Sequence, residues 1–162
     1  MTTPPPRPTP GRLRGTLAAF LIAWIAATAT ARGSETLRDL PPGDPERRRL
    51  LELLRPVMER EMRGPVEFRV KLARTLRGWG LVRVEPQRPG GSRIALGETV
   101  FAETSSSMDG LTTDALFRLR DDRWHLVTHV VGPTDAASSN WLFGDVPMRL
   151  WNPDFVEVEA PN

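Results

Sequence analysis

The chain has 162 residues and contains no cysteine, no tyrosine and a single lysine, Lys71. Without cysteine it can form no disulfide framework, thiolate metal site, thiol nucleophile or lipidated cysteine anchor. Without tyrosine it has no tyrosine side chain to act as a general acid, and Lys71 is the only lysine that could form a Schiff base with a substrate. The remaining composition, 40% hydrophobic and 26% charged, is that of an ordinary folded domain.

The first 31 residues have the pattern of a secretory signal peptide. Residues 1–14 contain three arginines and no acid, an apolar run follows over 17–27, and Ala29-Thr30-Ala31 offers the small residues of a cleavage site. The run is shorter than the roughly 20 apolar residues of a membrane span. We therefore expect residues 1–31 to be a cleaved signal peptide. An uncleaved anchor, which would make the protein a membrane-tethered accessory subunit, is the alternative.

The charge balance changes once this segment is removed. The chain has 22 basic and 20 acidic residues, a formal net charge of +2, but removing the three arginines leaves 19 basic residues and a net charge of −1. Nucleic-acid binding needs clustered cations that displace counterions, so no nucleic-acid partner is predicted. An exported domain without cysteine favours the bacterial periplasm, because small secreted domains elsewhere usually carry disulfides.

A helix is predicted after a linker over residues 32–43. Asp44 is a good N-cap and Pro45 fits the first helical position. Leucine, valine and methionine then recur from Leu50 to Met62 at spacings of one, three and four, which predicts a single apolar face. Pro56 lies inside this run and predicts a kink, because a proline removes one hydrogen bond of the helix.

Strands are predicted downstream of the helix. Val66, Phe68, Val70 and Leu72 alternate with charged residues, which predicts a half-buried strand with these four on its inner face. The further strands expected are Trp79 to Glu85 after an Arg77-Gly78 turn, a short one from Glu98 to Glu103, and Thr113 to Arg120 and Arg123 to Val131 joined at Asp121-Asp122.

A two-residue turn at Asp121-Asp122 fixes the register of the last hairpin. One face is then formed by the pairs Leu119–Trp124, Phe117–Leu126 and Ala115–Thr128, and the other by Arg118–His125, Leu116–Val127 and Asp114–His129. The first set is the more apolar, so we expect it to face the core.

One helix followed by an antiparallel meander predicts an α+β roll over residues 44–135, with the helix packed on a curled sheet of four to five strands. This order of elements resembles the cystatin-like superfamily and, in shortened form, the nuclear-transport-factor-like cones. The stretch from Gly110 to Asp135, in which a strand opened by Trp124 ends in Gly132-Pro133-Thr134-Asp135, resembles small exported bacterial proteins of unknown function.

The resemblance implies a fold but no specific activity. The Gln-Val-Val-Ala-Gly-type hairpin of the cystatin inhibitors is missing from this sequence, so protease inhibition is not implied. Cone-fold enzymes generally close their pocket with several N-terminal helices, whereas one is predicted here. The resemblance therefore implies a roll without a deep catalytic pocket.

The C-terminal extension, residues 136–162, is too apolar for a solvated tail. We expect it to pack on the roll, with a short strand from Phe155 to Glu159. Its aromatic residues Trp141, Phe143 and Trp151 are the candidate ligand- or partner-binding residues, and membership of the core is their alternative role.

His129 is the main acid–base candidate, because a carboxylate opposite an imidazole orients it for proton transfer near neutral pH. Asp114 or Asp135 is its expected partner, and a purely structural cross-strand pair is the alternative. His125 and His129 would lie about 13 Å apart on a strand, too far to share one metal ion. No metal site and no cofactor are predicted.

These patterns favour a non-enzymatic exported domain that binds a protein or a small apolar ligand. The second hypothesis is a small cone-fold enzyme of the lyase or isomerase kind, with His129 as the base and Asp114 or Asp135 orienting it. The two hypotheses differ in what surrounds His129, since the enzyme requires this side chain to line a pocket.

Overall fold

The structure is a computed structural model that describes residues 35–108, 110–132 and 145–155. The predicted signal peptide, residues 1–31, lies outside these ranges. Among the described residues, no helix combines the length and the apolar character that a membrane crossing requires.

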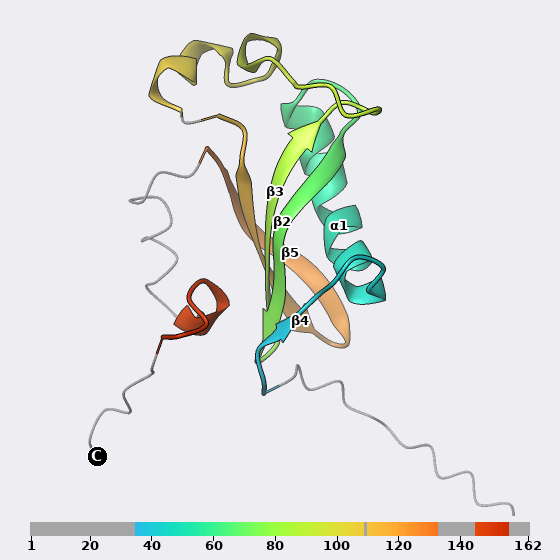
Figure 1. The fold of residues 1–162 in the computed structure, drawn as a ribbon, viewed down its shortest axis with the longest axis vertical. Helices are drawn as coiled ribbons and strands as arrows, with labels where there is room; N and C mark the ends of the chain where they lie inside the picture. The colour runs from blue at the N-terminus through green and yellow to red at the C-terminus, as the bar shows by residue number, and fades with distance from the viewer. Residues whose placement is uncertain (1–34, 109, 133–144, 156–162) are drawn as a thin grey trace, which may run out of the picture.

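Within the described ranges, one α-helix and one antiparallel sheet form the domain (Figure 1). The sheet is an open meander in the order β1-β2-β3-β4-β5, in which each strand pairs with the next. This arrangement confirms the predicted α+β fold with a single helix. The elements are β1 (Arg38–Asp39), α1 (Pro45–Glu61), β2 (Glu67–Leu76), β3 (Trp79–Gln87), β4 (Thr113–Arg120) and β5 (Arg123–Val131), with short 3₁₀ helices η1 (Leu96–Glu98), η2 (Ala102–Ser107) and η4 (Met148–Leu150).

The helix α1 begins at the residues that the sequence predicts. The Asp44 side chain accepts hydrogen bonds from the backbone N–H groups of Glu46 at 2.7 Å and Arg47 at 3.4 Å, which satisfies donors that have no partner within the helix. Pro45 occupies the first turn, as expected. The helix runs on through Pro56 to Glu61, and the kink expected at Pro56 remains a prediction.

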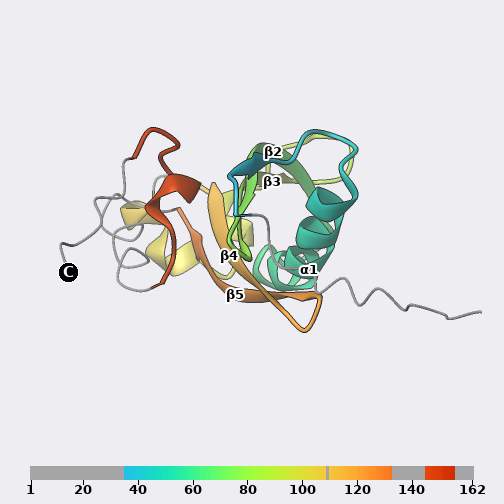
Figure 2. The same ribbon diagram turned by 90° about the horizontal axis from the view of Figure 1, so that it is seen from below.

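The inner face of the sheet packs against α1. Leu50, Leu54 and Met58 are fully buried there, in one cluster with Phe117 and Trp124 from the sheet. Figure 2 shows how β4 and β5 curve beneath the helix, which confirms the expected curl. The expected apolar face is nevertheless narrower than predicted. Leu53, which the spacing placed on it, is 39% exposed.

The outer face of the sheet carries a second cluster. Leu76 and Leu81 from the sheet are buried here together with Leu150 of η4, and Figure 2 shows η4 in red on the side of the sheet opposite α1. Residues 145–155 of the C-terminal extension therefore contribute to the outer face of the sheet, and the packing of the whole extension on the roll stays a prediction. Of the short strand expected at Phe155 to Glu159, only Phe155 is described, and it is not in a strand.

A bulge in β2 overturns the predicted position of Leu72. The pairing of β2 with β3 shifts by one residue between Val70 and Leu72. Phe68 and Val70 pack against the inner cluster, whereas Leu72 packs against the outer one. One inserted residue moves every following side chain to the opposite face, so the alternation of the first residues of β2 could not be extended to Leu72.

The β4–β5 hairpin has the predicted bounds and turn. Asp121 and Asp122 both adopt positive φ angles, 49° and 58°, as a two-residue turn of the type that matches strand twist requires. The register holds for the pairs near the turn and then shifts at a bulge between Leu116 and Phe117. Beyond it, the pairs are Leu116–Thr128, Ala115–His129 and Asp114–Val130, so the predicted pairs Ala115–Thr128, Leu116–Val127 and Asp114–His129 are wrong.

The segment between β3 and β4 also differs from prediction. Residues 98–103 form no strand and instead belong to turns and to η1 and η2. The Thr99 hydroxyl donates to the Leu96 carbonyl at 2.7 Å and accepts from the Phe101 N–H at 3.1 Å, and such local bonds compete with strand pairing. Within the expected linker, Arg38–Asp39 form β1 at the edge of the sheet.

Candidate functional site

Asp114 has a structural partner other than His129. Its carboxylate receives two hydrogen bonds from Arg83 of β3, at 2.6 Å from Nε and 2.7 Å from Nη2. The Asp114 side chain is only 2% exposed, and its hydrogen bond raises the pKa of the Arg83 guanidinium. Because the Asp114 carboxylate is engaged by this two-pronged contact, it links β3 to β4 and does not orient His129.

His129 points toward α1, where it meets Glu61. Its Nε2 lies 2.8 Å from Oε1 of Glu61, and both side chains are largely buried, with 22% and 20% exposed. The second carboxylate oxygen of Glu61 is buried and has no hydrogen-bond partner. His129 therefore has a carboxylate partner in the structure, but this partner is Glu61 and not Asp114.

The remaining candidates divide between the described and undescribed parts of the chain. Asp135, Trp141 and Phe143 lie outside the described residues. Trp151 is half-buried and packs against the outer cluster of Leu76, Leu81 and Leu150. That contact is the one expected of a core residue, and a role of Trp151 in binding a ligand or partner stays a prediction.

The two histidines lie on opposite faces of β5. His125 is exposed and pairs with Arg118, whose guanidinium stacks on the outer-face ring of Trp79 at 4.7 Å. His129 instead reaches Glu61 on the helix side, because the bulge lies between the two histidines. No group of three or more metal-ligating side chains occurs in the described part of the chain.

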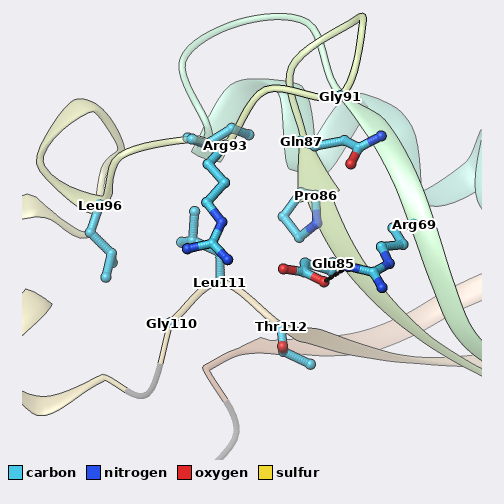
Figure 3. A pocket seen from close by; sticks show the side chains of 11 residues that line it. Arg69, Glu85, Pro86, Gln87, Gly91, Arg93, Leu96, Gly110, Leu111 and Thr112 are labelled. Atoms are coloured by element: carbon cyan, nitrogen blue, oxygen red, sulfur yellow. Dashed lines mark hydrogen bonds and ion pairs between the residues drawn. The ribbon is translucent and has the colours of Figure 1, made fainter.

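A cleft of about 360 Å³ opens where β3 ends and β4 begins (Figure 3). We call it the Arg93 cleft. Its position follows from a tight turn after β3, in which Gly90 and Gly91 adopt φ angles of +86° and +89°. The turn brings Arg93 back to a bridge with Gln87. The charged side chains lining the cleft are Arg69, Glu85 and Arg93, and its apolar lining comes from Pro86, Ile94, Leu96 and Leu111.

Glu85 is the only acid among the described side chains that line the cleft, and basic groups lie around it. Its Oε2 lies 3.1 Å from Lys71 Nζ and 3.5 Å from Arg69 Nη1. The hydrogen bond from Lys71 is the main cause of a lowered Glu85 pKa, to which the charges of Lys71, Arg69 and Arg93 add. In Figure 3 the Arg93 guanidinium and the Glu85 carboxylate point toward one another across the cleft. Glu85 therefore remains an anion within a basic surrounding.

A second hollow of about 640 Å³ lies between the first half of α1 and the β4–β5 hairpin. It is shallow, with Leu53 and Trp124 as its apolar surface and Arg48, Arg49 and Arg123 around them. The Trp124 indole N–H donates to Glu46 at 3.0 Å, so its polar group is already engaged. The Arg93 cleft is the better candidate site, because several side chains converge on it from different segments.

Sequence reasoning missed both Glu61 and the Arg93 cleft. Glu61 ends a helix 68 residues before His129, and no local pattern links the two. The Gly90-Gly91 pair is typical of a loop, and it is the one sequence signal near the cleft. No protein-family model, curated protein or solved structure matches the chain, so the resemblance to the cystatin-like and nuclear-transport-factor-like folds stays a prediction.

Proposed function

We propose that the protein is an exported binding module and that its ligand occupies the Arg93 cleft. The observation that carries the proposal is the cleft itself, about 360 Å³ in volume, with both charged and apolar side chains in its lining. Ligand sites in proteins combine an apolar wall with a few converging polar groups. The cleft lies between the ends of β2 and β3 and the loop that follows β3, and loops held by a rigid sheet are the usual location of binding residues.

Blocking the cleft tests this proposal. Thr112 lines it immediately before β4, and Arg120 is exposed at the far end of that strand. Calorimetry with octanoate, octanol and octyltrimethylammonium should detect binding of at least one of these probes to the wild-type protein and to Arg120→Trp, and none to Thr112→Trp. Binding that survives in Thr112→Trp, or no binding by the wild-type protein, would refute the proposal.

Export is the second part of the proposal and rests on the N-terminal sequence. A basic start, a short apolar run and Ala29-Thr30-Ala31 support cleavage after Ala31. Intact-mass measurement on the full chain expressed in a bacterium should give a product that begins at Arg32. Ala31→Glu should block cleavage at this site, and a wild-type product that keeps residues 1–31 would favour the membrane-tethered alternative.

An enzyme that uses His129 is the second candidate function. It is favoured by the 2.8 Å contact between His129 Nε2 and Glu61 Oε1, because a carboxylate that holds an imidazole orients it as a general base. His129 is not in the lining of either hollow described above, which favours the binding module. A screen of lyase and isomerase substrates should show turnover that His129→Ala abolishes and His125→Ala retains, if the enzyme hypothesis is correct.

A further inference from the structure

The chemistry of the Arg93 cleft indicates which ligands it accepts. Its described lining residues contribute two guanidinium groups, Arg69 and Arg93, against the single carboxylate of Glu85. Lys71 adds a further cation through its 3.1 Å contact with Glu85. A second acid, Glu67, accepts a hydrogen bond from the Gly90 N–H at 3.3 Å in the turn beside the cleft. The three described cations at the cleft therefore still outnumber its two described acids, although residues 32–162 as a whole carry a formal net charge of −1. This local excess of cations favours an anion over a neutral or cationic molecule.

Arg93 has hydrogen-bond donors to offer. Within the described residues, no hydrogen bond or ion pair engages its guanidinium, and its contribution to Glu85 is the longer-range effect of its charge. Arg69 is 66% exposed and touches Glu85 through one nitrogen at 3.5 Å. A guanidinium presents several N–H groups in a planar fork that matches a carboxylate or a phosphate. Most of this capacity is unused in the cleft.

Glu85 acts here as a positioning residue for the cations. It contacts Lys71 and Arg69 from β2, so its own charge is already balanced by groups on the neighbouring strand. Arg93 approaches from the other side of the cleft, on the segment that follows the Gly90-Gly91 turn (Figure 3). An anion bound beside Arg93 would thus meet a cation whose charge is not matched by a contacting carboxylate.

The size and apolar lining limit the rest of the ligand. A volume of about 360 Å³ corresponds to about a dozen water molecules, which suits a small organic molecule. Pro86, Ile94 and Leu96 line the cleft with apolar surface. A ligand that used both features would have one anionic group and a short apolar body.

We propose that the Arg93 cleft selects a small organic anion, a carboxylate or phosphate monoester with a short apolar body, with Arg93 as its main receptor. This inference rests on the proposed binding function and goes beyond it by naming the ligand class. The anionic group takes the free donors of Arg93, and the apolar body lies along Ile94 and Leu96.

The ligand class is tested with probes that share an eight-carbon chain and differ in the charge of the head group. Calorimetry should show octanoate and octyl phosphate binding the full-length protein at least tenfold more tightly than octanol or octyltrimethylammonium. Arg93→Gln should weaken the two anions by about ten- to a hundredfold, as expected for hydrogen bonds to a charged group. Arg120→Gln removes an exposed arginine from the far end of β4 and should leave the binding of both anions unchanged.

The outcomes separate this inference from the function on which it rests. If octanol binds as tightly as octanoate, or Arg93→Gln leaves anion binding unchanged, while Thr112→Trp still abolishes binding, the cleft is a binding site but the ligand class is wrong. If Thr112→Trp binds every probe like the wild-type protein, or the wild-type protein binds none of them, the binding module and the ligand class fall together. Equal weakening in Arg93→Gln and Arg120→Gln would indicate a general charge effect and would also overturn the role of Arg93.

Discussion

His129 Nε2 lies 2.8 Å from Oε1 of Glu61 and so joins β5, an edge strand of the sheet, to the last residue of α1. The pair depends on the bulge in the β4–β5 pairing, which turns His129 toward the helix and places it beside Ala115. Without that bulge His129 would face the outer side of the sheet together with Asp114. One irregular position thus decides which carboxylate the imidazole meets.

His129→Ala should lower the free energy of unfolding by about 1–3 kcal/mol, because it leaves the largely buried Glu61 carboxylate without its hydrogen-bonded partner. Chemical denaturation measures the loss. His125→Ala, which changes the exposed histidine of the same strand, should alter stability by about 0.5 kcal/mol or less. Equal effects of the two substitutions would show that the pair with Glu61 does not stabilise the fold.

Removing Arg83 should destabilise the protein more than removing Asp114 does. Asp114 is 2% exposed and Arg83 is 40% exposed, so Arg83→Met leaves a buried charge, whereas Asp114→Asn leaves an arginine that water can reach. Breaking a buried pair costs about 3–5 kcal/mol. Allowing for the partial exposure of Arg83, we expect about 2–3 kcal/mol for Arg83→Met and a smaller loss for Asp114→Asn in urea denaturation. The reverse order would contradict this account.

Lys71→Met should raise the pKa of Glu85, because the hydrogen bond from Lys71 is the largest cause of its lowering. Arg93→Gln should raise it less, since Arg93 acts through its charge alone. NMR titration of the side-chain carboxyl measures both shifts. A lowered pKa stabilises the folded protein above the unfolded-state pKa, and this contribution is lost as the pH falls through the folded-state value. The stability difference between wild type and Lys71→Met that arises from Glu85 should therefore vanish at acid pH, and a difference that persists there must come from another group.

The sequence signals that succeeded are local ones. Asp44 and Pro45 set the start of α1, and Asp121-Asp122 set the hairpin, because a cap and a tight turn depend on adjacent residues. Bulges are the reason for the main errors. An inserted residue at Lys71 or at Val127 leaves the neighbouring hydrophobic pattern intact while it exchanges the faces of all later side chains. A single sequence gives no sign of where such an insertion falls.

The Arg93 cleft could not be derived for a different reason. Its charged residues come from β2, from β3 and from the loop after β3, so that only the complete fold brings Arg69, Glu85 and Arg93 together. The contact of His129 with Glu61 likewise spans 68 residues. Charge and residue type alone do not encode such distant neighbours. Local alternation did predict that β2 and β3 are strands, although both extend further toward the C-terminus than the expected Leu72 and Glu85.

Gly80→Ala should destabilise the protein by about 1–3 kcal/mol, the usual cost of adding volume to a packed core. A Cβ at position 80 would lie 3.3 Å from Leu50 Cδ1 of α1 and 3.3 Å from Trp124 Cζ3 of β5. Gly97→Ala is the control, because no atom lies within 4 Å of a Cβ there. Thermal unfolding compares the two. A neutral Gly80→Ala would mean that the helix is not packed closely on the sheet at this point.

Trp151→Ala separates the two roles considered for the C-terminal aromatics. Trp151 packs against the outer cluster of Leu76, Leu81 and Leu150 and is half-buried. We therefore expect Trp151→Ala to lower the free energy of unfolding by about 2–4 kcal/mol, somewhat less than the loss of a fully buried tryptophan. Phe155→Ala, at a ring that is 39% exposed, should cost less. Octanoate binding in the Arg93 cleft should persist in Trp151→Ala at a temperature where this variant is folded. If stability is unchanged and binding is lost, Trp151 belongs to a binding surface, and the cleft is not the principal site.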